Sequence, residues 1–183
     1  MYEYLEPLKR KLLSLKIAKP PPPWELKTVI SVGGLCSVGF DRSTENLLIL
    51  SHQGRGVVDC STVEKTARDY EDYYENQYLE AEGIGCLKGK IIKMAGLFGG
   101  GLPICTEDDW CLESVTINFP EEMILLVEPG SDLYGMTCNR PNNFTKIDQQ
   151  ATIRAYGFSY TGQSLIVATS SDVTIYSRSN KLS

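Results

Sequence analysis

The sequence contains one stretch twice, and this repeat limits the possible folds more than any other feature. In the first copy, Gly39-Phe40 precedes six polar residues, an apolar run over 47–51 and, after a short turn, a run over 57–61. In the second copy, Gly157-Phe158 precedes six further polar or small residues, a run over 165–169 and a run over 173–177. Short runs rich in Val, Ile and Thr between turn residues are typical of strands. The repeat predicts two antiparallel hairpins, with a turn two residues longer in the first.

A third hairpin is expected between the two copies. Residues 110–118 and 123–128 are candidate strands, joined through Phe119-Pro120-Glu121-Glu122. A chain of 183 residues is long enough for one domain with a full core. We therefore expect a mainly β fold of antiparallel, blade-like hairpins, arranged as a partial or distorted propeller or as a β-sandwich. A single β-rich domain over residues 24–183 would contain them all.

The N-terminal segment, residues 1–23, has a different pattern. Apolar residues recur at helical spacing between Tyr4 and Ile17, with basic residues between them. This spacing predicts an amphipathic helix docked on the body of the protein. The prolines of residues 20–23 would end the helix and form an extended polyproline II spacer that leads to Trp24.

The turn that opens each repeat resembles a pattern of WD40-like β-propeller blades, in which Gly-Phe-Ser/Asp-x-x-Gly precedes a buried strand and a hairpin. Residues 157–162, Gly-Phe-Ser-Tyr-Thr-Gly, match the whole pattern, and residues 39–44, Gly-Phe-Asp-Arg-Ser-Thr, match it without the final glycine. The resemblance covers residues 39–61 and 157–177. The Gly-His and Trp-Asp signatures of that family are absent. The resemblance implies blade-like hairpins.

The composition favours a protein of the cytoplasm. No apolar run approaches the roughly 20 residues that span a bilayer, and residues 1–19 lack the apolar stretch of a secretory signal. Because no export signal accompanies them, the six cysteines are expected to be reduced thiols. None of them forms a C-x-x-C pair, and the chain has one histidine, His52. We therefore expect no metal site.

No segment has the pattern of a catalytic or cofactor site. The glycine-rich stretches 32–35 and 96–101 lack the residues that follow the glycines in a phosphate-binding loop, and turns or bulges explain them better. Nucleophilic catalysis would need His52 beside Cys36 or Cys60. We expect no enzyme and no cofactor, with a Cys-His hydrolase as a minor alternative.

The acidity of the chain is concentrated in residues 69–82. This segment contains six acids, four tyrosines and no base, so the rest of a chain of net charge −5 sums to +1. Tyrosine offers a large rigid contact area, and clustered carboxylates attract a basic partner. A second acidic group lies beside Trp110, a residue type that is enriched at binding hot spots. The candidate partner-binding residues are Asp69, Tyr70, Glu71, Asp72, Tyr73, Tyr74, Glu75, Tyr78, Glu107, Asp108, Asp109 and Trp110.

These features point to a protein that binds another macromolecule. Phosphates repel carboxylates, so nucleic acid is not an expected partner, and neither is a membrane. In general character the chain is similar to bacterial immunity proteins, which neutralise a cognate toxin that is often a basic nuclease. The alternatives are a scaffold or adaptor module in a multiprotein assembly, and a solvated charged loop with no binding role.

Overall fold

The structure is a computed structural model, and it describes residues 3–178. Its fold is mainly β, with fourteen antiparallel strands and an N-terminal helix among these residues, as the sequence predicts. The chain forms two compact units: a first unit of residues 1–21 and 105–151, and a second unit of residues 22–104 and 152–183. This division differs from the expected single domain over 24–183. Residues 1–2 and 179–183 of the expected segments lie outside the described residues.

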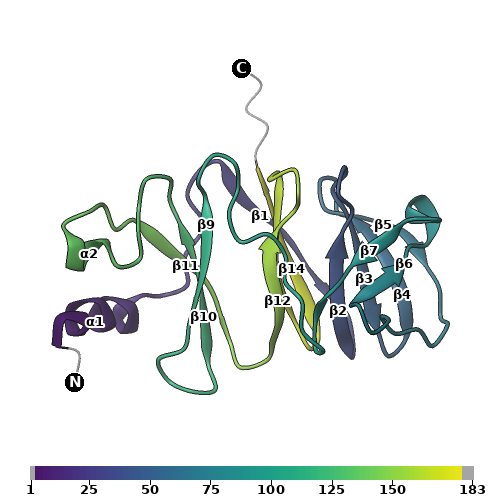
Figure 1. Cartoon of the computed structure of the whole chain (residues 1–183), viewed down its shortest axis with the longest axis horizontal. Helices are drawn as coiled ribbons and strands as arrows, with labels where there is room; N and C mark the ends of the chain where they lie inside the picture. The colour runs from purple at the N-terminus through teal and green to yellow at the C-terminus, as the bar shows by residue number, and fades with distance from the viewer. Residues whose placement is uncertain (1–2, 179–183) are drawn as a thin grey trace. The chain divides into compact units, whose positions relative to one another are not determined.

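Within its described residues, the first unit contains two α-helices, a short 3-10 helix and a three-stranded sheet (Figure 1). Its elements are η1 (Glu3–Leu5), α1 (Glu6–Ser14), β9 (Cys111–Val115), β10 (Glu122–Val127), α2 (Gly135–Cys138) and β11 (Phe144–Gln150). The sheet order is β11-β10-β9, and both pairings are antiparallel. The hairpin β9-β10 is the predicted middle hairpin, with Met123 opposite Val115.

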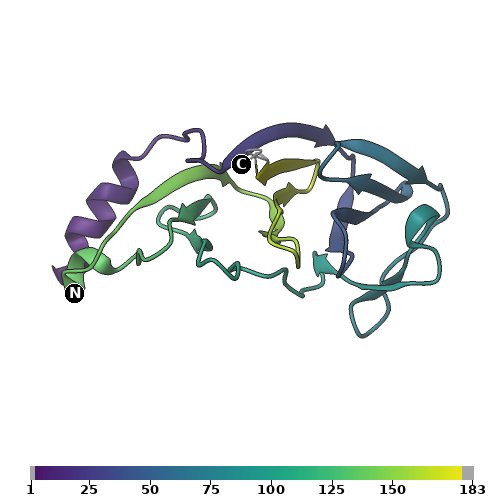
Figure 2. The same cartoon turned by 90° about the horizontal axis from the view of Figure 1, so that it is seen from above.

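Helix α1 docks on this sheet, as its apolar pattern predicts. Leu8 and Leu12 are buried in one cluster with Leu125 of β10 and Phe144 of β11. The helix also lies beside the segment around α2 in both views (Figures 1 and 2), where the Lys11 ammonium donates to the Asn142 carbonyl at 2.8 Å. The helix ends at Ser14, three residues before the predicted end.

The second unit contains most of the strands (Figure 1). Its elements are β1 (Trp24–Ser31), β2 (Leu35–Phe40), β3 (Asn46–Ser51), β4 (Gly54–Asp59), β5 (Glu64–Arg68), β6 (Glu80–Glu82), η2 (Gly85–Leu87), β7 (Ile91–Lys93), β8 (Ala95–Gly96), β12 (Ile153–Phe158), β13 (Ser164–Thr169) and β14 (Asp172–Arg178). Two larger sheets have the orders β1-β14-β13-β12 and β5-β4-β3-β2-β8, and β6 pairs with β7.

The sequence repeat is a structural repeat. It forms the meanders β2-β3-β4 and β12-β13-β14, in which Phe40 lies opposite Leu47 and Phe158 lies opposite Leu165. Both first strands also contain a register shift, between positions 35 and 37 in one copy and 153 and 155 in the other. The predicted difference in turn length is wrong. Strand β4 begins at Gly54, so two residues separate the strands in each copy, 52–53 and 170–171.

The glycine of each repeat lies where another segment crosses the strand. A Cβ on Gly39 would lie 2.2 Å from the Lys93 carbonyl oxygen, and one on Gly157 would lie 2.3 Å from the Leu102 Cβ. Real Cβ atoms do not approach so closely, because interiors are already close-packed. Glycine is therefore required at both positions for packing.

The two larger sheets of the second unit share a core. One buried cluster contains Leu47 and Val58 from one sheet and Ile166 and Ile175 from the other. Residues that point the other way from β3 and β4, such as Leu48 and Val57, pack with Ile92 and Leu87 in a further cluster. The sheet β5-β4-β3-β2-β8 is thus covered on both faces.

The proline tract joins the two units at residues 21–22. The expected polyproline II spacer is wrong in its second half, because the chain turns at Pro22-Pro23, whose peptide bond is cis. Trp24 then begins β1 and is buried against Phe158, with ring centroids 5.3 Å apart. In the described part of the chain, no helix has the length and apolar character needed to cross a membrane.

Candidate protein-binding surface

The acidic segment Asp69–Glu82, which we call the acidic strip, belongs to the second unit; it follows β5 and ends with β6. Residues 69–76 have no regular secondary structure, and a turn at 77–79 leads into β6. In that turn the Asn76 Oδ1 accepts from the backbone N–H groups of Tyr78 and Glu80 at 2.8 and 3.1 Å. The strip thus follows a defined path over the surface of the unit.

A buried arginine from outside the strip holds its first half. Arg55 of β4 is 8% exposed, and its guanidinium pairs with the carboxylates of Asp69 at 2.8 Å and Glu71 at 3.5 Å. It also donates to the Glu82 carbonyl at 3.1 Å and lies 4.1 Å from the ring centroid of Tyr73. The Tyr73 hydroxyl in turn accepts from the Glu82 backbone N–H at 2.9 Å. One guanidinium therefore links both ends of the strip.

The six carboxylates of the strip are not equivalent. Asp69 and Glu71 are paired with Arg55, and Glu80 is paired with Lys93 at 2.7 Å. Asp72 is exposed and lies beside Tyr74, where its negative charge raises the pKa of the Tyr74 phenol above the ordinary value. Two bases thus offset part of the charge that the sequence assigns to this segment.

Three of the four tyrosine rings face solvent. Tyr70, Tyr74 and Tyr78 are 83, 50 and 66% exposed, whereas Tyr73 is half-buried against Arg55. Exposed rings of this size are a recognised signal of a contact surface when they cluster.

One such cluster surrounds a shallow hollow beside the strip. The hollow has a volume of about 420 Å³ and is lined by Tyr74, Glu75, Asn76, Gln77, Leu79 and Phe98. Phe98 is 61% exposed and stands at the tip of a tight turn, where Gly96 and Gly99 exchange backbone hydrogen bonds. We call this feature the Tyr74–Phe98 hollow. Two aromatic rings thus stand beside an acidic residue.

Glu75 is the acidic residue of the hollow. One of its carboxylate oxygens accepts from the Ser37 hydroxyl at 3.0 Å. The other, Oε1, is buried and accepts no hydrogen bond from the residues that the structure describes. The carboxylate therefore retains an unused acceptor, which buried polar groups rarely do.

The two cysteines nearest to His52 in sequence, Cys36 and Cys60, are poorly suited to nucleophilic chemistry. Cys36 and Cys60 are both buried, and burial raises the pKa of each thiol, with Glu75 adding to the effect at Cys36. A thiol with a raised pKa has little of the reactive thiolate form at neutral pH. His52 lies in the exposed two-residue turn between β3 and β4. These positions do not favour the Cys-His hydrolase.

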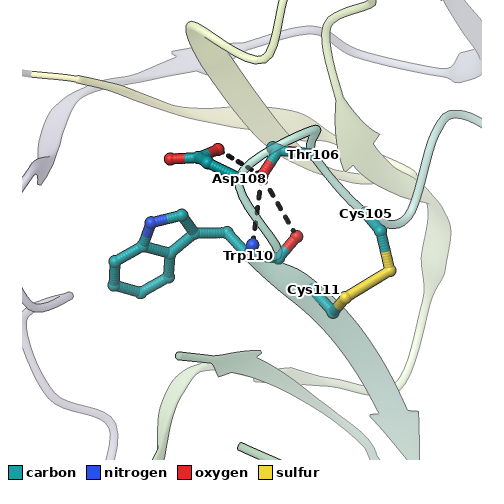
Figure 3. Close-up of a disulfide and its surroundings, with 5 residues drawn as sticks. All are labelled: Cys105, Thr106, Asp108, Trp110 and Cys111. Carbon is teal, nitrogen blue, oxygen red and sulfur yellow. Dashed lines mark hydrogen bonds between the residues drawn. A yellow bond between two sulfur atoms is a disulfide. The ribbon is translucent and has the colours of Figure 1, made fainter. Parts of the chain in front are cut away.

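The second predicted group, Glu107 to Trp110, lies in the first unit, whereas the acidic strip belongs to the second. It forms a loop closed by a disulfide between Cys105 and Cys111 (Figure 3). Within the loop the Thr106 hydroxyl donates to the Asp108 carboxylate at 2.7 Å and accepts from the backbone N–H of Trp110 at 3.1 Å. The expectation of reduced thiols is therefore wrong for this pair.

Trp110 does not offer its ring to a partner. Its side chain points away from the disulfide (Figure 3), and the residue is 6% exposed. Glu107, Asp108 and Asp109 are exposed. Of the residues predicted to bind a partner in this loop, the three carboxylates are exposed and the Trp110 ring is not.

Two contributors to the surface were not predicted from the sequence. Phe98 lies in the glycine-rich stretch 96–101, and an aromatic residue between Gly96 and Gly99 is a signal for a ring presented at the tip of a turn. Arg55 lies fourteen residues before the nearest acid that it binds, Asp69. Only the β4-β5 pairing brings the two together.

The comparisons with known proteins give no further guide. No family model matches the chain, and no curated protein matches it. Among the residues that the structure describes, no group of three or more His, Cys, Asp or Glu side chains is arranged to hold a metal ion.

Proposed function

We propose that this protein is a non-catalytic binding protein and that its acidic strip, with the Tyr74–Phe98 hollow, binds a basic protein. The observation that carries the proposal is the hollow itself, where exposed Tyr74 and Phe98 stand beside the Glu75 carboxylate. Aromatic faces and carboxylates together suit a Lys or Arg side chain, through cation–π and charge attraction.

The Arg55 network supports the proposal through preorganisation. Its contacts with Asp69, Glu71 and Tyr73 fix the backbone that presents Tyr70 and Tyr74. A surface that is ordered before binding loses less conformational entropy when the partner arrives. The remaining negative charge speeds association with a positively charged partner, and salt weakens this effect.

The finer form of the proposal is an immunity protein that neutralises a basic toxin, such as a nuclease. In that role the strip would pair with the Lys and Arg residues that the toxin uses for its substrate. A scaffold role would use the same surface for weaker contacts with several proteins. The two differ in stoichiometry and strength, since an inhibitor forms a tight one-to-one complex.

The experiment compares matched variants on and off the surface. The binding variant carries Asp72→Asn and Phe98→Ser, two exposed residues outside the Arg55 network. The control carries Glu64→Gln and Phe119→Ser, an exposed acid on β5 and a Phe that is 91% exposed in a turn of the first unit. Each protein is used to capture partners from the source cell, and the dissociation constant for each purified partner is then measured at low and high salt.

The expected result is one basic partner that the natural chain and the control retain with equal affinity. The binding variant should weaken the complex at least tenfold, and raised salt should weaken the complex of the natural chain. A partner that binds both variants equally would overturn the proposed surface. A partner without excess positive charge would overturn the proposed chemistry.

A further inference from the structure

A second cavity in the second unit has a chemistry opposite to that of the acidic strip. It has a volume of about 350 Å³ and opens between the end of β1 and the face of β3, β4 and β5. Apolar side chains contribute to it from both larger sheets, namely Ile30 of β1, Ile49 of β3 and Val58 of β4. The lining also contains Lys65 and Arg68 of β5 and no acidic residue.

A β-bulge places both basic residues on the same face of the sheet. Val58 lies opposite Lys65, Val57 lies opposite Ala67, and Gly56 lies opposite Arg68, with a register shift between Val57 and Val58. Successive side chains of a strand alternate between faces, so Gly56 and Val58 share one face. The extra residue in β5 brings Lys65 and Arg68 to that same face, over the apolar cluster.

Gly56 leaves the space that the cavity occupies. A Cβ built on Gly56 would meet its nearest atoms, those of Arg68 and Ala67, at 3.7 to 3.9 Å, which is ordinary contact. The position could therefore carry a side chain without strain, and such a side chain would enter the cavity.

The two cations are available to a ligand. Within residues 3–178, neither Lys65 nor Arg68 has a carboxylate as an ion-pair partner. Arg68 is held in place by neutral groups, because it donates to the Gln53 carbonyl at 3.0 Å and its guanidinium lies 5.1 Å from the Tyr70 ring centroid. An oriented guanidinium and an ammonium that line the same cavity are suitable partners for a carboxylate.

We propose that this cavity binds a small amphipathic carboxylate. Its apolar body contacts Ile30, Ile49 and Val58, and its carboxylate pairs with Lys65 and Arg68. The volume lies within the range of small-molecule sites, and at roughly 30 Å³ per water-sized group it holds about a dozen such groups. A medium-chain alkyl carboxylate fits both the size and the charge. The proposal does not rest on the protein-binding function, although Tyr70 of the acidic strip also lines this cavity. None of the residues changed in its test belongs to the Tyr74–Phe98 hollow.

The test uses octanoate as the probe, with octylammonium as a probe of equal length and opposite charge. Binding to the full chain is followed by amide chemical shifts and by calorimetry below the concentrations at which these probes form micelles. We expect octanoate to bind with shifts at residues 30, 49, 56, 58, 65 and 68, and octylammonium to bind at least tenfold more weakly.

Three variants examine the assignment. Gly56→Val should weaken octanoate binding at least tenfold, because its three added carbon atoms take up part of the cavity. Lys65→Gln combined with Arg68→Gln should also weaken it at least tenfold. Lys88→Gln, which changes an exposed lysine outside the cavity, should leave it unchanged. If Gly56→Val does not fold, as judged by circular dichroism, the octanoate affinity of the Lys65→Gln, Arg68→Gln double variant tests the site by itself.

Four different results would contradict the proposed carboxylate site. Equal binding of octylammonium would show an apolar groove without charge recognition. Shifts that cluster beside Leu8 and Leu12, where a separate apolar pocket lies in the first unit, would place the ligand elsewhere. Failure to bind at millimolar octanoate, or full binding by Gly56→Val, would also overturn the proposal.

Discussion

The guanidinium of Arg55 lies 4.1 Å from the ring centroid of Tyr73, and the same guanidinium pairs with Asp69 at 2.8 Å. The acidic strip is therefore folded around a cation that the strip itself does not contain. A group of carboxylates with a buried counterion keeps a fixed conformation, whereas carboxylates alone would repel one another. This relationship separates the strip from a solvated acidic loop.

Replacing this cation should destabilise the protein. We expect Arg55→Met to lower the free energy of unfolding by about 3 kcal/mol, because the variant leaves Asp69 without its buried partner. Arg68→Met is the matched control, since Arg68 lies on the adjacent strand, is exposed and has no ion pair among residues 3–178. Its effect should stay within about 0.5 kcal/mol. Urea denaturation measures both, and equal effects would contradict the role of Arg55.

Asp41 should make the stability depend on pH. Burial alone would raise the pKa of this carboxyl, but hydrogen bonds from Lys90, Thr44 and Ser43 outweigh burial and lower it below the ordinary 3.8. A carboxyl whose pKa is lower in the folded state stabilises the fold above its unfolded pKa, and this contribution is lost as the pH falls through the folded value.

The variant Asp41→Asn isolates this contribution. At pH 7 it should lower the free energy of unfolding by about 2 kcal/mol, because the bonds to the Lys90 ammonium lose their charge-assisted character. The difference from the natural chain should shrink toward zero well below pH 3.8, where Asp41 itself is protonated. Denaturant unfolding of both proteins at several pH values measures this difference in the free energy of unfolding. A difference that stays constant with pH would contradict the assignment.

Local pattern accounts for the part of the fold that the sequence predicts correctly. The apolar runs at 47–51 and 165–169 became β3 and β13, and the helical spacing of Leu8 and Leu12 became the buried face of α1. These features repeat at short period, so they can be recognised without tertiary information. The resemblance to WD40-like blades stays a prediction.

The features that the sequence did not predict depend on residues far apart in the chain or on the exact register of strand pairing. The Arg55–Asp69 pair needs the β4-β5 register, and that register contains a bulge. The start of β4 cannot be read from an apolar pattern, because Arg55 and Gly56 are not apolar residues, although both are buried in that strand. The Cys105–Cys111 disulfide joins residues six apart in sequence, and neither the absence of an export signal nor the length of the chain indicates it.

The glycine of the first repeat should be intolerant of any side chain. Gly39→Ala would place a Cβ 2.2 Å from the Lys93 carbonyl oxygen, and backbone can move little inside a sheet. We expect the free energy of unfolding to fall by about 3 kcal/mol. Gly101→Ala is the control, because no heavy atom lies within 4 Å of the added Cβ, and its effect should be near zero. Thermal unfolding of both variants measures the contrast, and similar melting temperatures would contradict the close contact at Gly39.

The disulfide should stabilise the loop that holds Trp110 in place. The bond joins residues six apart, so Cys111→Ser should lower the free energy of unfolding by about 2 kcal/mol, which is modest because the closed loop is short. Strong reductant should have the same effect on the natural chain and none on the variant. Cys86→Ser, which changes an exposed free cysteine, should resemble the natural chain under both conditions. Denaturation followed by tryptophan fluorescence measures these differences. If reductant leaves the natural chain unchanged while Cys111→Ser destabilises it, the loss would arise from packing of the Cys111 side chain and the disulfide would have no stabilising role.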